Sequence, residues 1–305
     1  MKYVYGPIPS RRLGKSLGVS PIPKKACNFS CVYCQVGRTD MMMNSRRTFF
    51  PLEEIINELE QVLKLNENLD VISVVGEGEP TLYLQLGKLI DEIHRISDKP
   101  VAVITNSALL YDPQVQTEIG KADIVLPTLD AYDEASFRKI NRPHGSLEFK
   151  KVLEGLIEFS HSFQGELWLE IMLMKDINDD LSSLEKYQEI LKKIKYNRLY
   201  LNTPVRPPAE LNINVVSEER MNEAVKLLGG TSISSLSSGC FFSEIKDDYE
   251  AILSIIKRHP MNQHEIEGFL KSRKTQNIDS IIQELKNDES IETVNYKGFI
   301  TFRVK

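Results

Sequence analysis

Residues 71–80 read Val-Ile-Ser-Val-Val-Gly-Glu-Gly-Glu-Pro, a short apolar run that ends at a glycine-rich turn. A run of this length, rich in β-branched residues and followed by glycine and proline, predicts a buried β-strand. Segments with the apolar spacing of a helix lie on either side of it, at Leu52–Leu65 and Leu84–Ile96. A strand between two helices is typical of a parallel α/β sheet.

The same alternation of strands and helices extends to about residue 230. Six strands are too few for a closed barrel of eight, so the sequence predicts an α/β fold with an open (β/α)6 partial TIM barrel. In such a sheet the chemistry belongs at the carboxyl ends of the strands. The predicted strands are Leu17–Ile22, Val71–Val75, Val101–Thr105, Ile124–Thr128, Leu167–Met172 and Arg198–Asn202. The further predicted helices are Glu134–Ile140, Leu147–Phe159, Leu181–Ile194 and Glu218–Leu228.

The pattern changes after the polar stretch Ser232–Gly239. Three short helices followed by a β-hairpin are the order of a winged helix-turn-helix. We therefore expect two domains, a partial barrel at residues 1–240 and a winged helix-turn-helix at residues 245–305. The predicted tail elements are the helices Ile245–Lys257, Asn262–Leu270 and Ile278–Lys286 and the strands Ile291–Asn295 and Phe299–Val304.

Composition narrows the class of protein. The chain has 305 residues, of which 41% are hydrophobic and 27% charged, and a formal net charge of −5, as expected of a soluble globular protein. No apolar run approaches the roughly 18 residues of a membrane span. Pro7, Pro9, Arg11 and Arg12 fall where a secretory signal would be apolar. The sequence therefore predicts a cytoplasmic protein without a membrane partner.

Cysteine usage points to a metal. Cys27, Cys31 and Cys34 lie within eight residues of one another, whereas Cys240 is far away. A secreted protein held together by disulfides would be a small chain with evenly paired cysteines. This chain is long and its cysteines are clustered three to one, so that class of protein is excluded. Cys240 has three open interpretations: an ordinary buried cysteine, a ligand of a second site or a radical-relay thiol.

Three thiolates at this spacing can hold one face of a cubane iron–sulfur cluster. A complete shell needs four ligands, so one iron would remain open to a small molecule. A structural zinc site also wants four ligands, and no further cysteine or histidine pair lies near Cys27–Cys34. Zinc and simple burial of the thiols remain the alternatives.

Polar residues follow the predicted strands. Gly78 and Glu79 follow the second strand, Asn106 the third and Asp130 the fourth, while Glu170 and Asn202 lie in the fifth and sixth strands. Because the carboxyl ends of parallel strands share one edge, we expect these side chains to surround one pocket. The alternatives are ordinary turns and, for Glu170, a neighbouring arginine or lysine that neutralises a buried carboxylate.

The spacing Cys-x3-Cys-x2-Cys, with an aromatic residue directly before the last cysteine, resembles the signature of radical S-adenosylmethionine (SAM) enzymes. The resemblance implies that Cys27, Cys31 and Cys34 bind a [4Fe–4S] cluster whose open iron chelates SAM. Gly78-Glu79-Pro80 resembles the family element that holds the SAM amino group, with Glu77 where glycine is usual. The residues that would hold SAM are Tyr33, Gly78, Glu79, Asn106, Asp130, Glu170 and Asn202.

Four further segments resemble the wyosine-synthase-like (tRNA imidazoG37 synthetase-like) subgroup of that family: residues 6–14, 77–81, 138–143 and 202–208. The resemblance implies reductive cleavage of SAM to a 5′-deoxyadenosyl radical and hydrogen abstraction from a macromolecule, with tRNA or nucleoside modification as the leading expectation. An electron donor of the flavodoxin or ferredoxin type is implied. Arg11, Arg12 and Arg206 are the candidates for contacting an anionic group of the substrate.

Charge leaves the substrate open. Residues 1–50 carry a net charge of +8, residues 51–245 carry −13 and residues 246–305 are neutral. A nucleic-acid-binding tail would be expected to be basic. The tail could instead capture a peptide or protein substrate. A third hypothesis is a DNA-binding iron–sulfur redox sensor, which would need no SAM pocket.

Overall fold

The computed structural model describes residues 2–65, 68–233, 241, 243 and 245–305. Within them, the main sheet has eight strands in the order β1-β2-β5-β6-β7-β8-β9-β10. Every neighbouring pair from β2 to β10 is parallel, and only β1 runs antiparallel to its neighbour β2. The strands are β1 (Val4–Ser10), β2 (Gly14–Val19), β5 (Val71–Val74), β6 (Val101–Thr105), β7 (Ile124–Pro127), β8 (Glu166–Met172), β9 (Arg198–Asn202) and β10 (Thr231–Ser232).

All six strands expected from the sequence are present as β2 and β5–β9, so the α/β fold with a parallel sheet is confirmed. Two strands that the sequence did not predict, β1 and β10, extend the sheet at its two edges. Pro7 and Pro9 lie within β1, and proline is tolerated there because an edge strand leaves some backbone donors unpaired. The first predicted strand, Leu17–Ile22, is shifted to Gly14–Val19.

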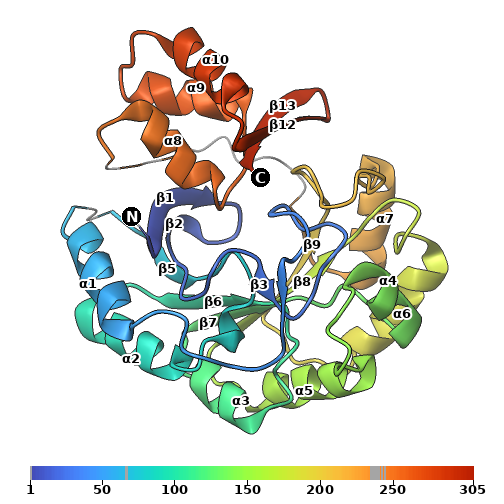
Figure 1. Cartoon of the computed structure of the whole chain (residues 1–305). Helices are drawn as coiled ribbons and strands as arrows, with labels where there is room; N and C mark the ends of the chain where they lie inside the picture. Colours follow the sequence, from blue (N-terminus) through green and yellow to red (C-terminus); the bar gives the residue numbers. More distant parts are fainter. Residues whose placement is uncertain (1, 66–67, 234–240, 242, 244) are drawn as a thin grey trace.

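Helices surround the outside of the curved sheet (Figure 1). Apolar side chains from these helices meet the sheet in a core that includes Leu59, Ile90, Leu156 and Tyr187. The sequence missed α3, although Asp112 caps its start and Pro113 occupies its first turn. The helices are α1 (Leu52–Leu63), α2 (Leu86–Ile96), α3 (Pro113–Ile119), α4 (Glu134–Ile140), α5 (Phe149–Ser162), α6 (Leu181–Leu191) and α7 (Glu218–Leu228).

The C-terminal part has its own apolar core, centred on Ile252, Phe269 and Phe302. Its strands form a sheet in the order β11-β13-β12, and Lys297 and Gly298 both have positive φ in the turn between β12 and β13. Positive φ at both central residues is typical of a tight hairpin turn. The elements are α8 (Asp248–Ile256), β11 (Met261–Asn262), α9 (Gln263–Ser272), α10 (Ile278–Asn287), β12 (Ile291–Tyr296) and β13 (Phe299–Val304).

This C-terminal part, here called the tail, lies over β1 and β2 at one edge of the main sheet (Figure 1). Ile8 of β1 packs against the tail core, and the Arg258 guanidinium donates to the carbonyl oxygen of Lys2 at 2.7 Å. None of the helices in the described ranges combines the length and apolar character that a bilayer span requires.

Candidate functional site

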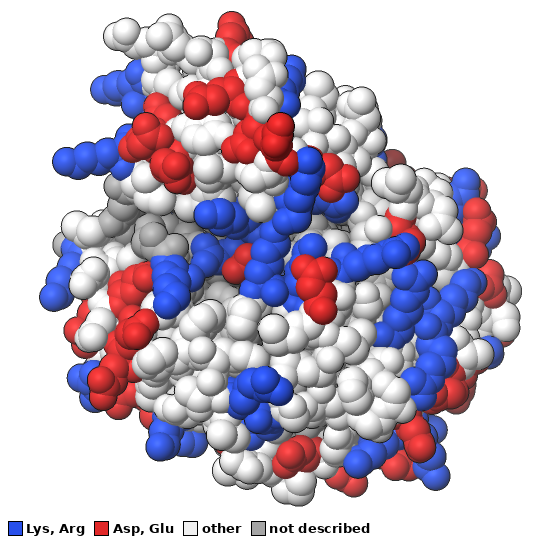
Figure 2. Space-filling model, viewed as in Figure 1, with Lys and Arg blue, Asp and Glu red and all other residues white. Residues whose placement is uncertain are grey.

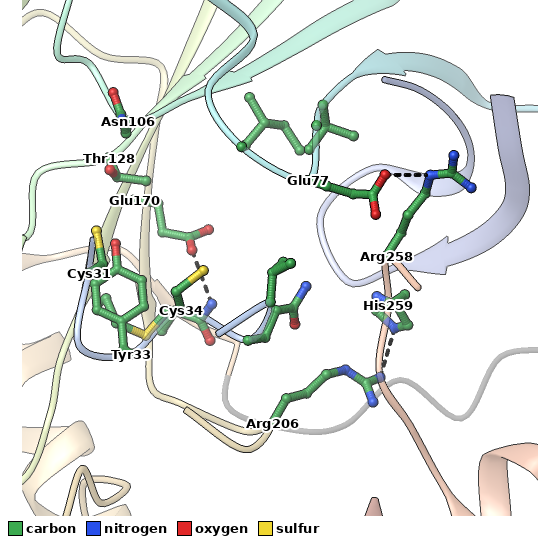
Figure 3. A pocket seen from close by; sticks show the side chains of 18 of the residues that line it. Cys31, Tyr33, Cys34, Glu77, Asn106, Thr128, Glu170, Arg206, Arg258 and His259 are labelled. Carbon is green, nitrogen blue, oxygen red and sulfur yellow. Dashed lines mark hydrogen bonds and ion pairs between the residues drawn. The ribbon is translucent and has the colours of Figure 1, made fainter. Parts of the chain in front are cut away.

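A cavity of about 370 Å³ lies at the carboxyl ends of the strands. Its wall is formed by the cysteine segment, the ends of β5, β6, β8 and β9, the turn between β1 and β2, and the residues that follow α8 in the tail (Figure 3). The structure brings every candidate site residue named from the sequence to this wall except Asp130. These residues are Arg11, Arg12, Cys27, Cys31, Tyr33, Cys34, Gly78, Glu79, Asn106, Glu170, Asn202 and Arg206.

The three cysteines reach the cavity from one irregular segment. Cys27 belongs to β3 (Ala26–Cys27), which pairs in parallel with β4 (Met41–Met42). A turn follows, in which the Cys34 backbone N–H donates to the carbonyl oxygen of Cys31 at 3.1 Å. All three are free thiols and are partly exposed to the cavity. Burial raises the pKa of each thiol, so a bound cation is what would favour their thiolate forms.

The spread of these thiols bears on which metal fits. Among the described residues, no three His, Cys, Asp or Glu side chains are grouped closely enough to bind a single ion. A zinc site needs its ligands around one ion. In a [4Fe–4S] cluster, by contrast, each cysteine binds a different iron, so the sulfur atoms stand further apart. Three cysteines around one cavity therefore fit a cluster better than a mononuclear zinc site.

The turn after β5 is packed against the cysteine segment. A Cβ atom at Gly78 would lie 1.9 Å from the carbonyl oxygen of Ala26, so only glycine fits there. The backbone N–H of Glu79 donates to that same oxygen at 3.0 Å. This contact places Gly78 and Glu79 directly beside the residue that precedes Cys27.

The Glu79 carboxylate is buried and hydrogen-bonded, but its Oε2 atom accepts from the Asn106 backbone N–H alone among the described residues, so it can accept a further hydrogen bond. The two carboxylate oxygens together accept hydrogen bonds from the Thr105 hydroxyl at 2.7 Å, the Asn106 backbone N–H at 2.7 Å and the backbone and hydroxyl of Thr81. Burial is the main cause that raises the pKa of Glu79, although these hydrogen bonds act in the opposite direction. The Asn106 amide in turn donates to Asn28 Oδ1 at 2.7 Å and to Cys27 Sγ at 3.6 Å.

On the other side of the cavity, four polar side chains are linked by hydrogen bonds and an ion pair. The Glu170 carboxylate forms an ion pair with Arg12 and accepts from Asn202 Nδ2 at 3.0 Å. Asn202 Oδ1 then accepts from Arg11 at 3.2 Å. Glu170 thus has the arginine neighbour that the alternative interpretation required, but it also lines the cavity.

Among the described residues, Arg11 is the cavity arginine without an acidic partner. Arg12 pairs with Glu170, Arg206 with Glu265 and Arg258 with Glu77, whereas the described residues provide no carboxylate within 4.0 Å of Arg11. Its guanidinium donates to neutral oxygens of Asn202 and Ile233. Desolvation within the cavity lowers the pKa of Arg11 to about 10. An anionic ligand group would compensate this charge.

Asp130 differs from its expected position. Its buried carboxylate lies outside the cavity wall and accepts from the Tyr33 hydroxyl, from Asn141 Nδ2 at 3.1 Å and from the Met172 backbone N–H at 3.1 Å. Burial raises the pKa of Asp130 to about 6. The reason for the difference is that Tyr33 lies between Asp130 and the cavity, so Asp130 supports the cysteine turn rather than facing a ligand.

Arg206 joins the tail to the cavity. Its buried guanidinium donates to both carboxylate oxygens of Glu265, at 2.8 and 2.9 Å. It also donates to His259 Nε2 at 2.8 Å (Figure 3). These contacts favour a role between the two parts of the chain over the predicted contact with substrate. Burial and the neighbouring arginines hold the pKa of His259 well below its usual range, so its ring is neutral and can accept this bond.

Sequence reasoning missed the cavity residues Arg258 and His259, which come from the tail. It noted Glu77 only as a departure from a glycine, and the structure pairs Glu77 with Arg258 at 3.3 Å. The one sequence signal was that mismatch, because a carboxylate in a glycine-rich turn requires a partner when it is buried. Cys240, which had three interpretations, lies outside the described residues.

Known proteins resemble this chain along most of its length. The sequence profile of the Radical SAM superfamily matches residues 22–201. A UPF0026 protein of Methanocaldococcus jannaschii is 38% identical over 99% of this chain and 96% of its own length, and one of Helicobacter pylori is 31% identical over 92% and 91%. A protein of Brachyspira hyodysenteriae named GTPase Obg is 35% identical over 99% of this chain, which spans only 45% of that protein.

Solved structures share the fold. A radical SAM methyltransferase from Sphaerobacter thermophilus superimposes with a TM-score of 0.54 at 16% identity, over 73% of this chain and 67% of its own. The hydrogenase maturase HydG from Carboxydothermus hydrogenoformans gives a TM-score of 0.51 at 16% identity, over 80% and 56%. Because the profile match covers more than half of the chain and the UPF0026 relatives match nearly all of it, the chain belongs to the radical SAM superfamily, whose members use a [4Fe–4S] cluster and SAM, and within it to the UPF0026 proteins.

Proposed function

We propose that the chain is a radical SAM enzyme that modifies a nucleotide of RNA, and that this RNA is a tRNA. The observation that carries the enzyme assignment is the convergence of Cys27, Cys31 and Cys34 with Glu79 and Asn106 on one cavity at the strand ends. A redox sensor would need the three cysteines but not Glu79 and Asn106, because it does not bind SAM. A reduced cluster bound there supplies the electron that cleaves SAM to a 5′-deoxyadenosyl radical.

In this proposal the chain's own residues bind and orient. Cys27, Cys31 and Cys34 are the cluster ligands, with Tyr33 packed behind them. Gly78 and Glu79 receive the SAM amino group, since the turn brings backbone and carboxylate oxygens beside the cysteine segment. The remaining SAM contacts are Asn106, Glu170 and Asn202. A flavodoxin- or ferredoxin-type protein is the proposed electron donor.

We also propose that residues 1–240 form an open (β/α)6 partial TIM barrel and residues 245–305 a winged helix-turn-helix domain. The order α8, β11, α9, α10, β12, β13 supports the second assignment, as does its separate apolar core. The six consecutive parallel strands β2 and β5–β9 support the first.

The RNA substrate is supported by charge at the seam between the tail and the main sheet. Figure 2 shows lysine and arginine side chains gathered along this seam. Lys24 reaches the carbonyl oxygen of Lys305 at 3.0 Å, and Arg303, which is also paired with Glu292, reaches that of Pro207 at 3.3 Å, so basic side chains from both parts of the chain lie at the seam. Although the tail is neutral as a whole, this arrangement offers a polyanion a basic path to the cavity that contains Arg11, which has no carboxylate partner among the described residues.

The enzyme assignment is tested with anaerobically reconstituted protein, dithionite and SAM, in which 5′-deoxyadenosine should form. Cys31→Ala should lose that product and most bound iron. Met41→Ala serves as the matched control, because Met41 is exposed in the same segment and carries no thiol. Absence of 5′-deoxyadenosine from the reconstituted parent would overturn the assignment.

The substrate is tested by mass spectrometry of tRNA nucleosides and of the proteome from a deletion strain, complemented with the parent or with Cys31→Ala. A modified nucleoside that returns only with the parent gene is the expected result. A missing modification of a protein side chain would replace the RNA assignment by a peptide or protein substrate.

A further inference from the structure

The side-chain amide of Asn141 lies between a cysteine and a carboxylate. Asn141 Nδ2 is 3.4 Å from Cys31 Sγ and 3.1 Å from Asp130 Oδ2. Asn141 and Asp130 are only 2% and 3% exposed. An amide nitrogen carries two hydrogens, and this arrangement uses one for each neighbour. The sulfur therefore receives a donor that solvent does not replace.

Backbone contacts fix the distance between Asn141 and Cys31. Asn141 follows the last residue of α4, and the carbonyl oxygen of Ile140 accepts from the Val32 N–H at 2.9 Å. The carbonyl oxygen of Asn141 itself accepts from the Ser30 N–H at 2.9 Å. The end of α4 is thus bonded to the residues on both sides of Cys31, so the amide is held against the sulfur.

Asp130 fixes the orientation of the amide. Its carboxylate can only accept, so the Asn141 side chain must turn its nitrogen, and not its oxygen, toward Asp130 and Cys31. The same carboxylate holds the Tyr33 hydroxyl and the Met172 N–H, which keeps it in place. Neither Asn141 nor Asp130 lines the large cavity; both line a neighbouring pocket of about 20 Å³, which is too small for SAM or a nucleotide.

We propose that Asn141 is a positioning residue that donates a hydrogen bond to the Cys31 thiolate of the bound cluster and raises the reduction potential of that cluster. The inference rests on the proposed function, in which Cys31 is a ligand. A hydrogen bond to a ligand sulfur stabilises the more negative, reduced cluster more than the oxidised one. The added electron comes from the external one-electron donor, and no bond to Asn141 forms or breaks.

The test is an anaerobic redox titration of the full-length reconstituted protein at pH 8, followed by electron paramagnetic resonance of the reduced cluster without SAM. Asn141→Leu keeps the approximate size of the side chain but removes the donor. We expect its oxidation–reduction equilibrium to shift about tenfold toward the oxidised form, which is about 59 mV for a one-electron couple. Asn287→Leu is the matched control, since Asn287 is an exposed residue of α10.

Two further variants separate this role from a structural one. Asn141→Gln retains an amide and should recover part of the parent potential. Asn141→Ala also lacks the donor and should shift the equilibrium toward the oxidised form, as Asn141→Leu does. If Asn141→Leu loses its circular dichroism, the comparison of Asn141→Ala with Asn141→Gln decides the question.

The outcomes distinguish the inference from the function on which it rests. Asn141 variants that keep the cluster and titrate like Asn287→Leu would overturn the role of Asn141 and leave the enzyme assignment intact. A parent protein that retains no cluster after reconstitution would overturn the ligand assignment, and the role of Asn141 with it.

Discussion

The guanidinium of Arg206 is bonded to both carboxylate oxygens of Glu265, and each side chain is only 8% exposed. Glu265 also accepts from the Asn262 backbone N–H at 2.9 Å and so completes the capping box at the start of α9. One carboxylate therefore stabilises the first turn of a tail helix and joins that helix to the segment after β9.

Glu265→Gln should destabilise the protein by about 3–5 kcal/mol, because it leaves the buried Arg206 without a counter-charge. The free energy of unfolding in urea measures this change. The matched control is Glu223→Gln in the exposed Arg220–Glu223 pair, for which about 0–1 kcal/mol is expected. Equal stability of the two variants would show that the Arg206–Glu265 pair does not hold the tail.

Gly78→Ala should disturb the cysteine segment, since the added methyl group would lie 1.9 Å from the Ala26 carbonyl oxygen. Forced backbone shifts of this kind cost about 1–3 kcal/mol. We expect a lower thermal midpoint and less iron bound after reconstitution. Gly145→Ala, where a Cβ meets nothing within 4 Å, should retain the iron content of the parent. Full iron loading of Gly78→Ala would mean that the turn and the cysteine segment move independently.

The stability of the metal-free protein should depend on pH through Asp130. Its pKa is raised from 3.8 to about 6, so the folded state binds this proton more tightly than the unfolded state. The resulting stabilisation is complete below about pH 4 and is lost as the pH rises through about 6, by about 3 kcal/mol in total. Asp130→Asn should remove this part of the pH dependence in urea unfolding.

Asp288 provides the control of opposite sign. Its hydrogen bond from Tyr249 lowers the pKa of this carboxyl, so the stability it contributes is present above the ordinary pKa and is lost as the pH falls below it. Asp288→Asn should therefore change the profile only at the acidic end. The same profile for the parent and Asp130→Asn between about pH 4 and 6 would contradict the role given to Asp130.

Arg11→Met should weaken the binding of bulk tRNA about tenfold, because Arg11 is the cavity cation without an acidic partner among the described residues. Filter binding at fixed ionic strength measures the effect, and the salt dependence should become shallower. Lys226→Met, on the exposed side of α7, is the control for general loss of charge. Equal weakening by both variants would indicate non-specific binding.

The sequence was sufficient for the parallel sheet because short β-branched runs such as Val71–Val74 favour strands and are bounded by clear turns. It missed β10 and β11, which have two residues each and exist only through their pairing partners. It also missed β1, because prolines obscure a strand that survives at a sheet edge. Local sequence patterns predict the longer helices and strands. Short or proline-containing strands form only because a neighbouring strand pairs with them.

Much of the candidate site followed from residue types at strand ends, as with Glu79 and Asn202. The hydrogen-bond and ion-pair partners of the site residues could not be predicted from the sequence. Arg206 meets Glu265 across 59 positions of the chain, and Cys31 meets Asn141 across 110. A sequence gives the charge of Arg206 but not the placement of the tail that neutralises it. For the same reason Asn141 carried no signal beyond its place in residues 138–143, one of the segments that resemble the wyosine-synthase-like subgroup.

The cavity wall supplied by Arg258 and His259 has a consequence for biosynthesis. A ribosome completes the cysteine segment and strands β2–β9 before it reaches these two residues, and domains of a growing chain fold from the N-terminus. The nascent protein therefore has a cavity that is open on the side where the tail will later dock. The entrance through which iron and sulfide would reach the three cysteines is therefore wider before the tail docks than after it.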